Sequence, residues 1–232
     1  MIGFENAHKY HHGEYETKVV LYDVTFLFEP SDHVAVLAEG GAGKSTLVNL
    51  LSGLDQPTKG TVHRDADMSW PLGFAGPFHP AMTGEENVRT IAALADHDPD
   101  EIAAYVRLFT ELGHHFFEPV QTYSSTMRAL LAFATSMAIP AQVYLSDEKV
   151  AVGEGDMRAK CEAALRRKIR DAGLFLVTRN ARIAQSFADK FAVLRHGRII
   201  ACRDFEDARA LFEDTTSRLD EIADIMSGFH TA

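Results

Sequence analysis

Along most of this chain, short apolar segments alternate with turns and with segments of helical periodicity. This is the pattern of a mixed α/β fold. Residues 2–6 and 19–28 have the character of strands, and a polar loop at 11–14 separates them. We expect these two strands to form an antiparallel N-terminal part. Further strands are expected at 34–37, 61–68, 141–145, 174–178, 191–194 and 198–202.

Helical periodicity is concentrated in the middle of the chain. Thr83 followed by Glu86 is a capping box, so a helix should begin there and run to about Leu94. Segment 69–88, with three Pro and three Gly, cannot form a single regular element. Further helices are expected at 99–112, about 125–137, 158–170 and around 183–187.

These elements predict a single domain over residues 1–232. The predicted parts are an α/β core with the β part (1–79 and 139–202), a helical insert (80–138) and a helical tail (203–232). Within the tail, one buried stripe is expected from Ala208, Leu211, Phe212 and Leu219.

Composition restricts the function further. The 232 residues suffice for one large domain, and the formal net charge of −10 argues against nonspecific binding to nucleic acid or to an anionic membrane. Cys161 and Cys202 are isolated, which favours a reducing, cytoplasmic setting. No apolar run is long enough to span a membrane, so we expect any membrane role to come through a partner.

The chemistry is concentrated in the stretch that begins at Val34. A buried strand leads into a glycine-rich turn, Lys44-Ser45-Thr46 and a helix, which is the context of a phosphate-binding P-loop. Lys44 would reach the β- and γ-phosphates of a nucleoside triphosphate, and Ser45 would ligate Mg²⁺. Ala38 occupies the place of the motif's opening glycine. The residues expected to contact phosphate are Gly40, Gly41, Ala42, Gly43, Lys44, Ser45 and Thr46.

Two acidic residues complete this expectation. Strand 141–145 ends in Ser146-Asp147-Glu148, and in a parallel sheet this end would face the P-loop. Asp147 would hold the Mg²⁺ shell, and Glu148 would position or deprotonate the attacking water. Tyr10, upstream of the P-loop, is a candidate for stacking on an adenine.

Between the P-loop and Asp147 lies the sequence Tyr123-Ser124-Ser125-Thr126-Met127-Arg128. With this signature the chain resembles the ATP-binding subunit of ABC transporters, and more narrowly the branch that exports capsular polysaccharide, O-chains and teichoic acid. The resemblance covers nearly the whole chain. The segments that carry it are 69–88, 123–128, 147–153 and 157–161.

This resemblance implies a P-loop NTPase fold with a helical subdomain, bound ATP and Mg²⁺, and head-to-tail dimerisation. Each ATP would lie between one subunit's P-loop and the other's Ser124, Ser125 and Thr126. The region around His79 would sense the nucleotide and touch a transmembrane permease. The implied partners are that permease and a second nucleotide-binding subunit, most simply an identical chain. The implied location is the cytoplasmic face of the inner membrane, and the chain length favours the capsule-type subgroup.

Several positions depart from the family pattern. Thr126 stands where the signature has Gly, and Arg179 stands where a switch His should follow strand 174–178. Arg179 could still pair with the γ-phosphate in the manner of an arginine finger. Since these groups would meet the γ-phosphate, we expect ATP binding with weakened but non-zero hydrolysis.

Other functions are open on the sequence alone. A subunit that gates a permease by ATP-dependent dimerisation without turnover is the main alternative, favoured by Thr126 and Arg179. A soluble ABC-type ATPase of repair or translation would carry a second cassette or a long coiled-coil insertion, and neither is present. A P-loop kinase would leave the signature and the Asp147-Glu148 pair without a role.

Overall fold

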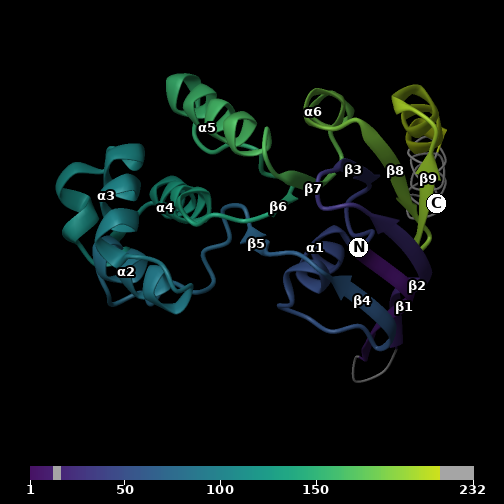
Figure 1. Cartoon of the computed structure of the whole chain (residues 1–232), viewed down its shortest axis with the longest axis horizontal. Helices are drawn as coiled ribbons and strands as arrows, with labels where there is room; N and C mark the ends of the chain where they lie inside the picture. The colour runs from purple at the N-terminus through teal and green to yellow at the C-terminus, as the bar shows by residue number, and fades with distance from the viewer. Residues whose placement is uncertain (13–16, 215–232) are drawn as a thin grey trace, which may run out of the picture.

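A computed structural model describes residues 1–12 and 17–214, and within that part of the chain two sheets carry the fold (Figure 1). The smaller sheet is antiparallel, with strand order β2-β1-β4. Its strands are β1 (Ile2–His12), β2 (Thr17–Phe28) and β4 (Lys59–Arg64). The expected antiparallel N-terminal part is therefore confirmed.

The larger sheet has the order β5-β6-β7-β3-β8-β9, and it is parallel except for the β8–β9 hairpin. Its strands are β3 (His33–Ala38), β5 (Met68–Pro71), β6 (Val143–Asp147), β7 (Gly173–Thr178), β8 (Lys190–Arg195) and β9 (Arg198–Cys202). Parallel strands buried on both faces are almost continuously apolar, which explains the unbroken runs in the sequence. The expected α/β class is confirmed.

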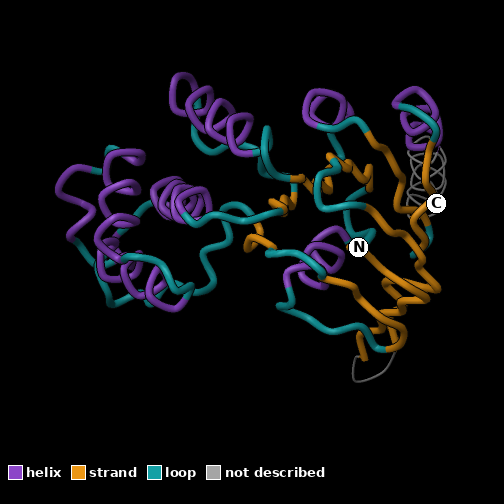
Figure 2. The backbone as a smooth tube through the Cα atoms, in the orientation of Figure 1, coloured by secondary structure: helices purple, strands orange, loops and turns teal. Residues whose placement is uncertain are grey.

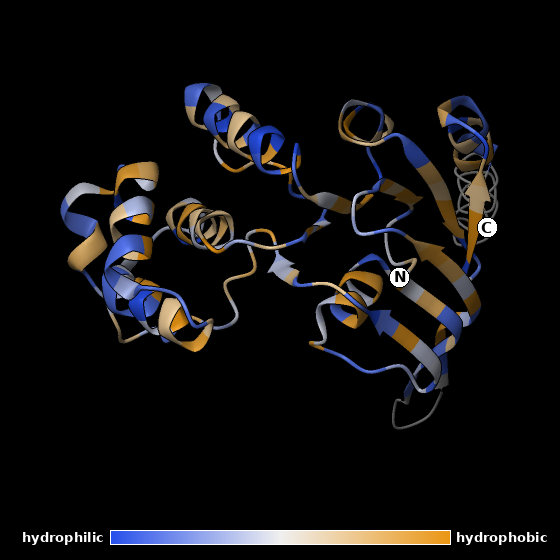
Figure 3. Ribbon diagram, in the orientation of Figure 1, coloured by the Kyte–Doolittle hydropathy of each residue, from blue (hydrophilic) through white to orange (hydrophobic). Residues whose placement is uncertain are grey.

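Alternate residues of β3 face different layers. Val34 and Val36 pack with helix α1 (Lys44–Ser52) and the antiparallel sheet. Ala35 and Leu37 pack toward α6 (Ala181–Phe187) and a helical segment at 205–214. In Figure 3, apolar residues (orange) alternate with polar residues (blue) along the strands and helices of the molecule. This two-sided burial holds β3 rigidly, and the functional loop begins at its end.

The helices of the middle of the chain form a separate lobe, which Figure 2 shows beside the strand-rich part. They are α2 (Gly84–Leu94), α3 (Pro99–Thr110), α4 (Ser125–Ala138) and the short 3₁₀ turns η1 (Gly113–Phe117) and η2 (Val120–Thr122). One apolar core joins this lobe to α5 (Gly155–Lys168) and to one face of β6 and β7. The boundaries 80–138 stay a prediction.

The predicted cap of α2 is confirmed. The Thr83 hydroxyl accepts from the Glu86 N–H at 3.1 Å, and the Glu86 carboxylate accepts from the Thr83 N–H at 2.8 Å. Both bonds satisfy N–H groups that the first helical turn leaves without partners. The helix ends at Leu94, as expected.

Two predictions about strands were wrong. The single strand expected at 61–68 is divided, because β4 ends at Arg64 in one sheet and β5 begins at Met68 in the other. Residues 65–67 between them cross from sheet to sheet. In addition, β1 continues past Asn6 to His12, since pairing with β2 extends it through a series of bulges.

The tail prediction is confirmed as far as the structure describes it. Ala208 and Phe212 are buried against the sheet, and Leu211 is partly buried there. Leu219 lies outside the described residues. No helix in residues 1–12 and 17–214 has the length and apolar character needed to cross a membrane.

Candidate functional site

The loop after β3 has the backbone that a phosphate site requires. Gly43 has a φ of 108°, and a Cβ there would lie 2.6 Å from Cγ1 of Val20, so only glycine fits. Helix α1 begins directly after it, which aims the free N–H groups of the first turn into the loop. Ala38 is the last residue of β3 and is not among the residues with positive φ. Replacing the motif's first glycine there therefore strains nothing.

Lys44 is fixed in this loop by contacts to both sides. Its Nζ donates to the carbonyl of Glu39 at 2.8 Å and lies 3.2 Å from Oε1 of Glu148. The side chain is only 11 % exposed. Hence β3 and β6, far apart in sequence, bring the P-loop lysine and the predicted base into an ion pair.

Ser45 and Asp147, the two predicted Mg²⁺ ligands, also meet. The Ser45 hydroxyl donates to Oδ2 of Asp147, which is the last residue of β6. A hydroxyl and a carboxylate are the hard oxygen donors that Mg²⁺ prefers. These residues therefore fit that ion beside the P-loop.

Glu148 is oriented by the neighbouring strand β7. Its backbone has a φ of 67°, and its N–H donates to the Val177 carbonyl at 2.8 Å. One carboxylate oxygen, Oε2, accepts from the Thr178 hydroxyl at 3.1 Å and from the Arg179 N–H at 3.3 Å. The other oxygen faces Lys44. The carboxylate is thus held at both oxygens.

Thr178 was not predicted as a functional residue. It is fully buried, and its hydroxyl also accepts from the Asn180 N–H at 3.1 Å. The sequence does carry a signal: a hydroxyl ends an otherwise apolar strand directly before Arg179. The Arg179 side chain is exposed, and it is the backbone N–H of Arg179 that contacts Glu148.

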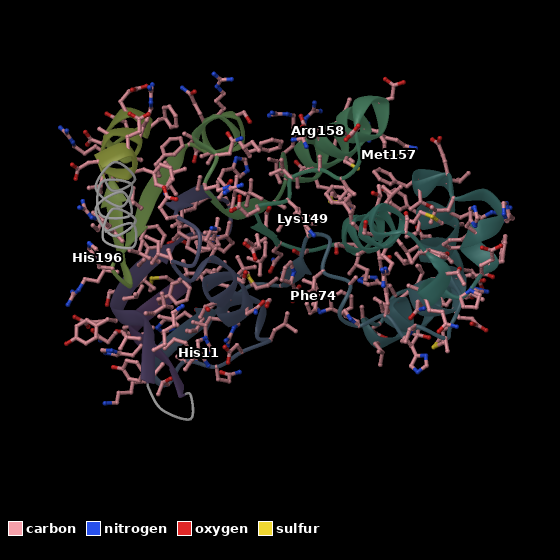
Figure 4. The ribbon with its side chains drawn as sticks, turned by 180° about the vertical axis from the view of Figure 1, so that it is seen from behind. His11, Phe74, Lys149, Met157, Arg158 and His196 are labelled. Atoms are coloured by element: carbon pink, nitrogen blue, oxygen red, sulfur yellow. The ribbon has the colours of Figure 1, made fainter. Side chains whose placement is uncertain are left out.

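A cavity of about 260 Å³ lies beside the P-loop. His11, near the end of β1 and labelled in Figure 4, and Lys18, from β2, contribute to its lining. Its lining residues are His11, Lys18, Val20, Gly41, Gly43, Lys44, Ser45 and Thr46. Gly40 and Ala42 line an adjoining cavity of about 280 Å³, which is bounded on its far side by the β8–β9 turn.

Tyr10 is directed elsewhere. Its hydroxyl forms a 3.0 Å hydrogen bond with Nδ1 of His8, and it is not among the residues that line either cavity. Stacking on an adenine stays a prediction, and it would require the ring to leave His8.

The remaining predicted residues lie in or next to the helical lobe. Ser124 caps α4 by accepting from the Met127 N–H at 3.1 Å, and Ser125 and Thr126 are exposed in the first turn. His79 is exposed, and its backbone is held by the buried Asn87 through bonds of 2.7 and 3.1 Å. None of these four lines the cavity at Lys44.

Figure 4 shows Phe74 and Lys149 at the junction of the two lobes, and Met157 and Arg158 on α5. Lys149 and Arg128 line a groove of about 350 Å³ there, together with Ser125 of the signature. The start of α4 therefore borders an open, positively charged groove.

These features together define a P-loop nucleotide-binding domain. They are a buried strand, a phosphate loop in which one position accepts only glycine, a lysine directed into that loop, and a contact between a serine and an aspartate. A family model described as ABC transporter matches residues 21–151. The chain belongs to the ABC transporter ATP-binding family, and it is an ATPase of that type that binds ATP.

Relatives extend this match over most of the chain. It is 38 % identical over 215 residues to the ATP-binding protein BexA of Haemophilus influenzae, covering 93 % of this chain and 99 % of BexA. It is 37 % identical over 208 residues to the capsule polysaccharide export ATP-binding protein CtrD of Neisseria meningitidis serogroup B, covering 90 % and 96 %. A solved dimeric ATP-binding cassette, MJ0796 bound to ADP and Pi, has the same fold: TM-score 0.72 at 19 % identity, covering 86 % and 96 %.

Proposed function

We propose that this chain is the ATP-hydrolysing subunit that powers export of a capsular or related cell-surface polysaccharide. The observation that carries the proposal is the contact set of Glu148, with Lys44 on one carboxylate oxygen and Thr178 and Arg179 on the other. A carboxylate held beside a phosphate loop is placed to accept a proton from water. The export role is supported by the names of CtrD and of the polysialic acid transport protein KpsT of Escherichia coli, 36 % identical over 191 residues.

Mg²⁺ would be held by Ser45 and Asp147, whose oxygens are already in contact. When bound, the ion would neutralise charge on the β- and γ-phosphates. The chain's own contribution is the cradle of N–H groups from Gly40 to Lys44 and the fixed ammonium of Lys44. Binding ATP would offer that ammonium a second anionic partner besides Glu148.

The proposed partners are a transmembrane permease and a second copy of this chain. ATP-binding subunits of this family work with a permease and dimerise, and the related cassette MJ0796 is dimeric. A head-to-tail dimer would bring the exposed Ser124, Ser125 and Thr126 of one copy to the P-loop of the other. We place the complex at the cytoplasmic face of the inner membrane, with this chain attached through the permease and His79 near that contact.

Thr126 and Arg179 set the expected rate of hydrolysis. Thr126 has the helical conformation of α4, so its side chain, rather than backbone strain, would crowd a phosphate that approaches its N–H. We propose slow turnover for this reason. The export ATP-binding proteins among the relatives favour this function over a gate that never hydrolyses ATP.

The test is reconstitution with the permease encoded in the neighbouring reading frames. Vesicles that contain both proteins should take up polysaccharide in an ATP-dependent manner, and Lys44→Ala should abolish uptake. Two results would contradict the proposal. One is the absence of any permease or glycan-export gene nearby, and the other is equal uptake of polysaccharide by the parent and by Lys44→Ala.

A further inference from the structure

Three side chains that could ligate a metal lie on η1 and on the residue directly after it, in the helical lobe. They are His114, His115 and Glu118, and their ligand atoms all lie within 4.8 Å of one another. Nδ1 of His115 is 2.7 Å from one carboxylate oxygen of Glu118, and Nε2 of His114 is 3.8 Å from the other. The two imidazole rings lie side by side, with centroids 4.0 Å apart.

We propose that His114, His115 and Glu118 form a binding site for a transition-metal dication, Zn²⁺ above all. Imidazole nitrogen and carboxylate oxygen are ordinary zinc ligands, and three protein ligands plus water complete a tetrahedral shell. With metal–ligand bonds of about 2.0–2.1 Å, tetrahedral ligands lie about 3.3 Å apart. The separations in the structure bracket that value, so modest side-chain rotations would close the site.

The backbone beneath these side chains is already ordered. Phe116 is buried in the core of the helical lobe, and the carbonyl of Glu118 accepts from the Gly84 N–H at 3.2 Å. The Glu118 N–H donates to the His115 carbonyl at 2.9 Å. Because the turn is fixed without help from the three side chains, replacing them should leave the fold intact.

The side chains are also accessible. His114 is 77 % exposed, and His115 and Glu118 are 44 % and 42 % exposed. A metal ion can therefore reach the carboxylate and both imidazoles from solvent.

The site connects to the signature through one hydrogen bond. The Tyr123 hydroxyl donates to the His115 carbonyl at 2.5 Å, and Tyr123 directly precedes the Ser124 cap of α4. Zn²⁺ at η1 would therefore stabilise the turn that supports the start of α4.

The experiment is calorimetric titration of tag-free full-length protein with Zn²⁺, in a Cys202→Ala background that removes a half-exposed thiol. We expect one bound Zn²⁺, a higher Tm in its presence, and at least tenfold weaker binding for His115→Ala and Glu118→Gln. His63→Ala is the matched control. It removes another His–Glu pair, His63 to Glu5 at 2.9 Å on the antiparallel sheet, and should bind as tightly as the parent.

An Asp147→Asn variant tests whether Zn²⁺ binds at the phosphate loop instead. It should bind Zn²⁺ as tightly as the parent. Two results would overturn the proposal: unchanged affinity in His115→Ala and Glu118→Gln, or loss of binding in Asp147→Asn. Because the readout is metal affinity, the result does not depend on the proposed export function.

Discussion

Thr178→Val tests whether the hydroxyl of Thr178 orients the catalytic carboxylate. The change keeps the shape of a fully buried side chain and removes the 3.1 Å bond to Oε2 of Glu148, together with the 3.1 Å bond accepted from the Asn180 N–H. A hydrogen bond to a charged group contributes about 1.5–3 kcal/mol. If the bond is needed in the transition state, that energy corresponds to a loss of kcat of about 10- to 150-fold. The Arg179 N–H remains, so some activity should survive.

The assay is steady-state phosphate release at saturating ATP. KM should change little, because Thr178 does not line the cavity beside the P-loop. Thr110→Val is the control, since that buried hydroxyl bonds only its own helix, donating to Val106 at 2.8 Å. In a Glu148→Gln background, Thr178→Val should cause little further loss, since the two residues act as a unit. A kcat within twofold of the parent, matching Thr110→Val, would refute the positioning role.

Gly43→Ala should abolish ATP binding in equilibrium titrations, because the new Cβ would lie 2.6 Å from Val20 at a φ of 108°. The control is Gly40→Ala, whose Cβ would have open space around it, and it should bind ATP within about threefold of the parent. Equal binding by both variants would show that the loop is not restricted as described. Thr126→Gly should raise the rate of phosphate release severalfold. It should also lower the free energy of unfolding, measured by urea titration, by about 0.5–1 kcal/mol, because glycine disfavours the first turn of α4. An unchanged or lower rate would remove Thr126 as the cause of slow turnover.

The parts of the site that the sequence predicted are those fixed by local geometry. A buried strand followed by Gly43 and Lys44 allows few structures, and a strand ending in Asp147 must point toward the same sheet edge as its parallel neighbours. The contact of Ser45 with Asp147 follows from these constraints. The capping box at Thr83 is local for the same reason.

Other parts depend on contacts between distant segments. The sequence alone could not divide segment 61–68, because the choice between the two sheets is made by β1 and β6. The role of Thr178 depends on the register of β7 against β6, which aligns Asp147 with Val177. The cluster of His114, His115 and Glu118 had a short sequence signal, but only the 3₁₀ turn shows that all three reach one point.

The central claim is that Glu148 acts as the base for ATP hydrolysis at a P-loop site. Its most direct test is phosphate release by purified protein, compared with Glu148→Gln at matched ATP occupancy. The amide keeps the shape of the carboxylate but cannot accept the proton of water, so we predict a rate lower by about 100-fold or more, with ATP binding retained. Equal rates for the two proteins would contradict the account.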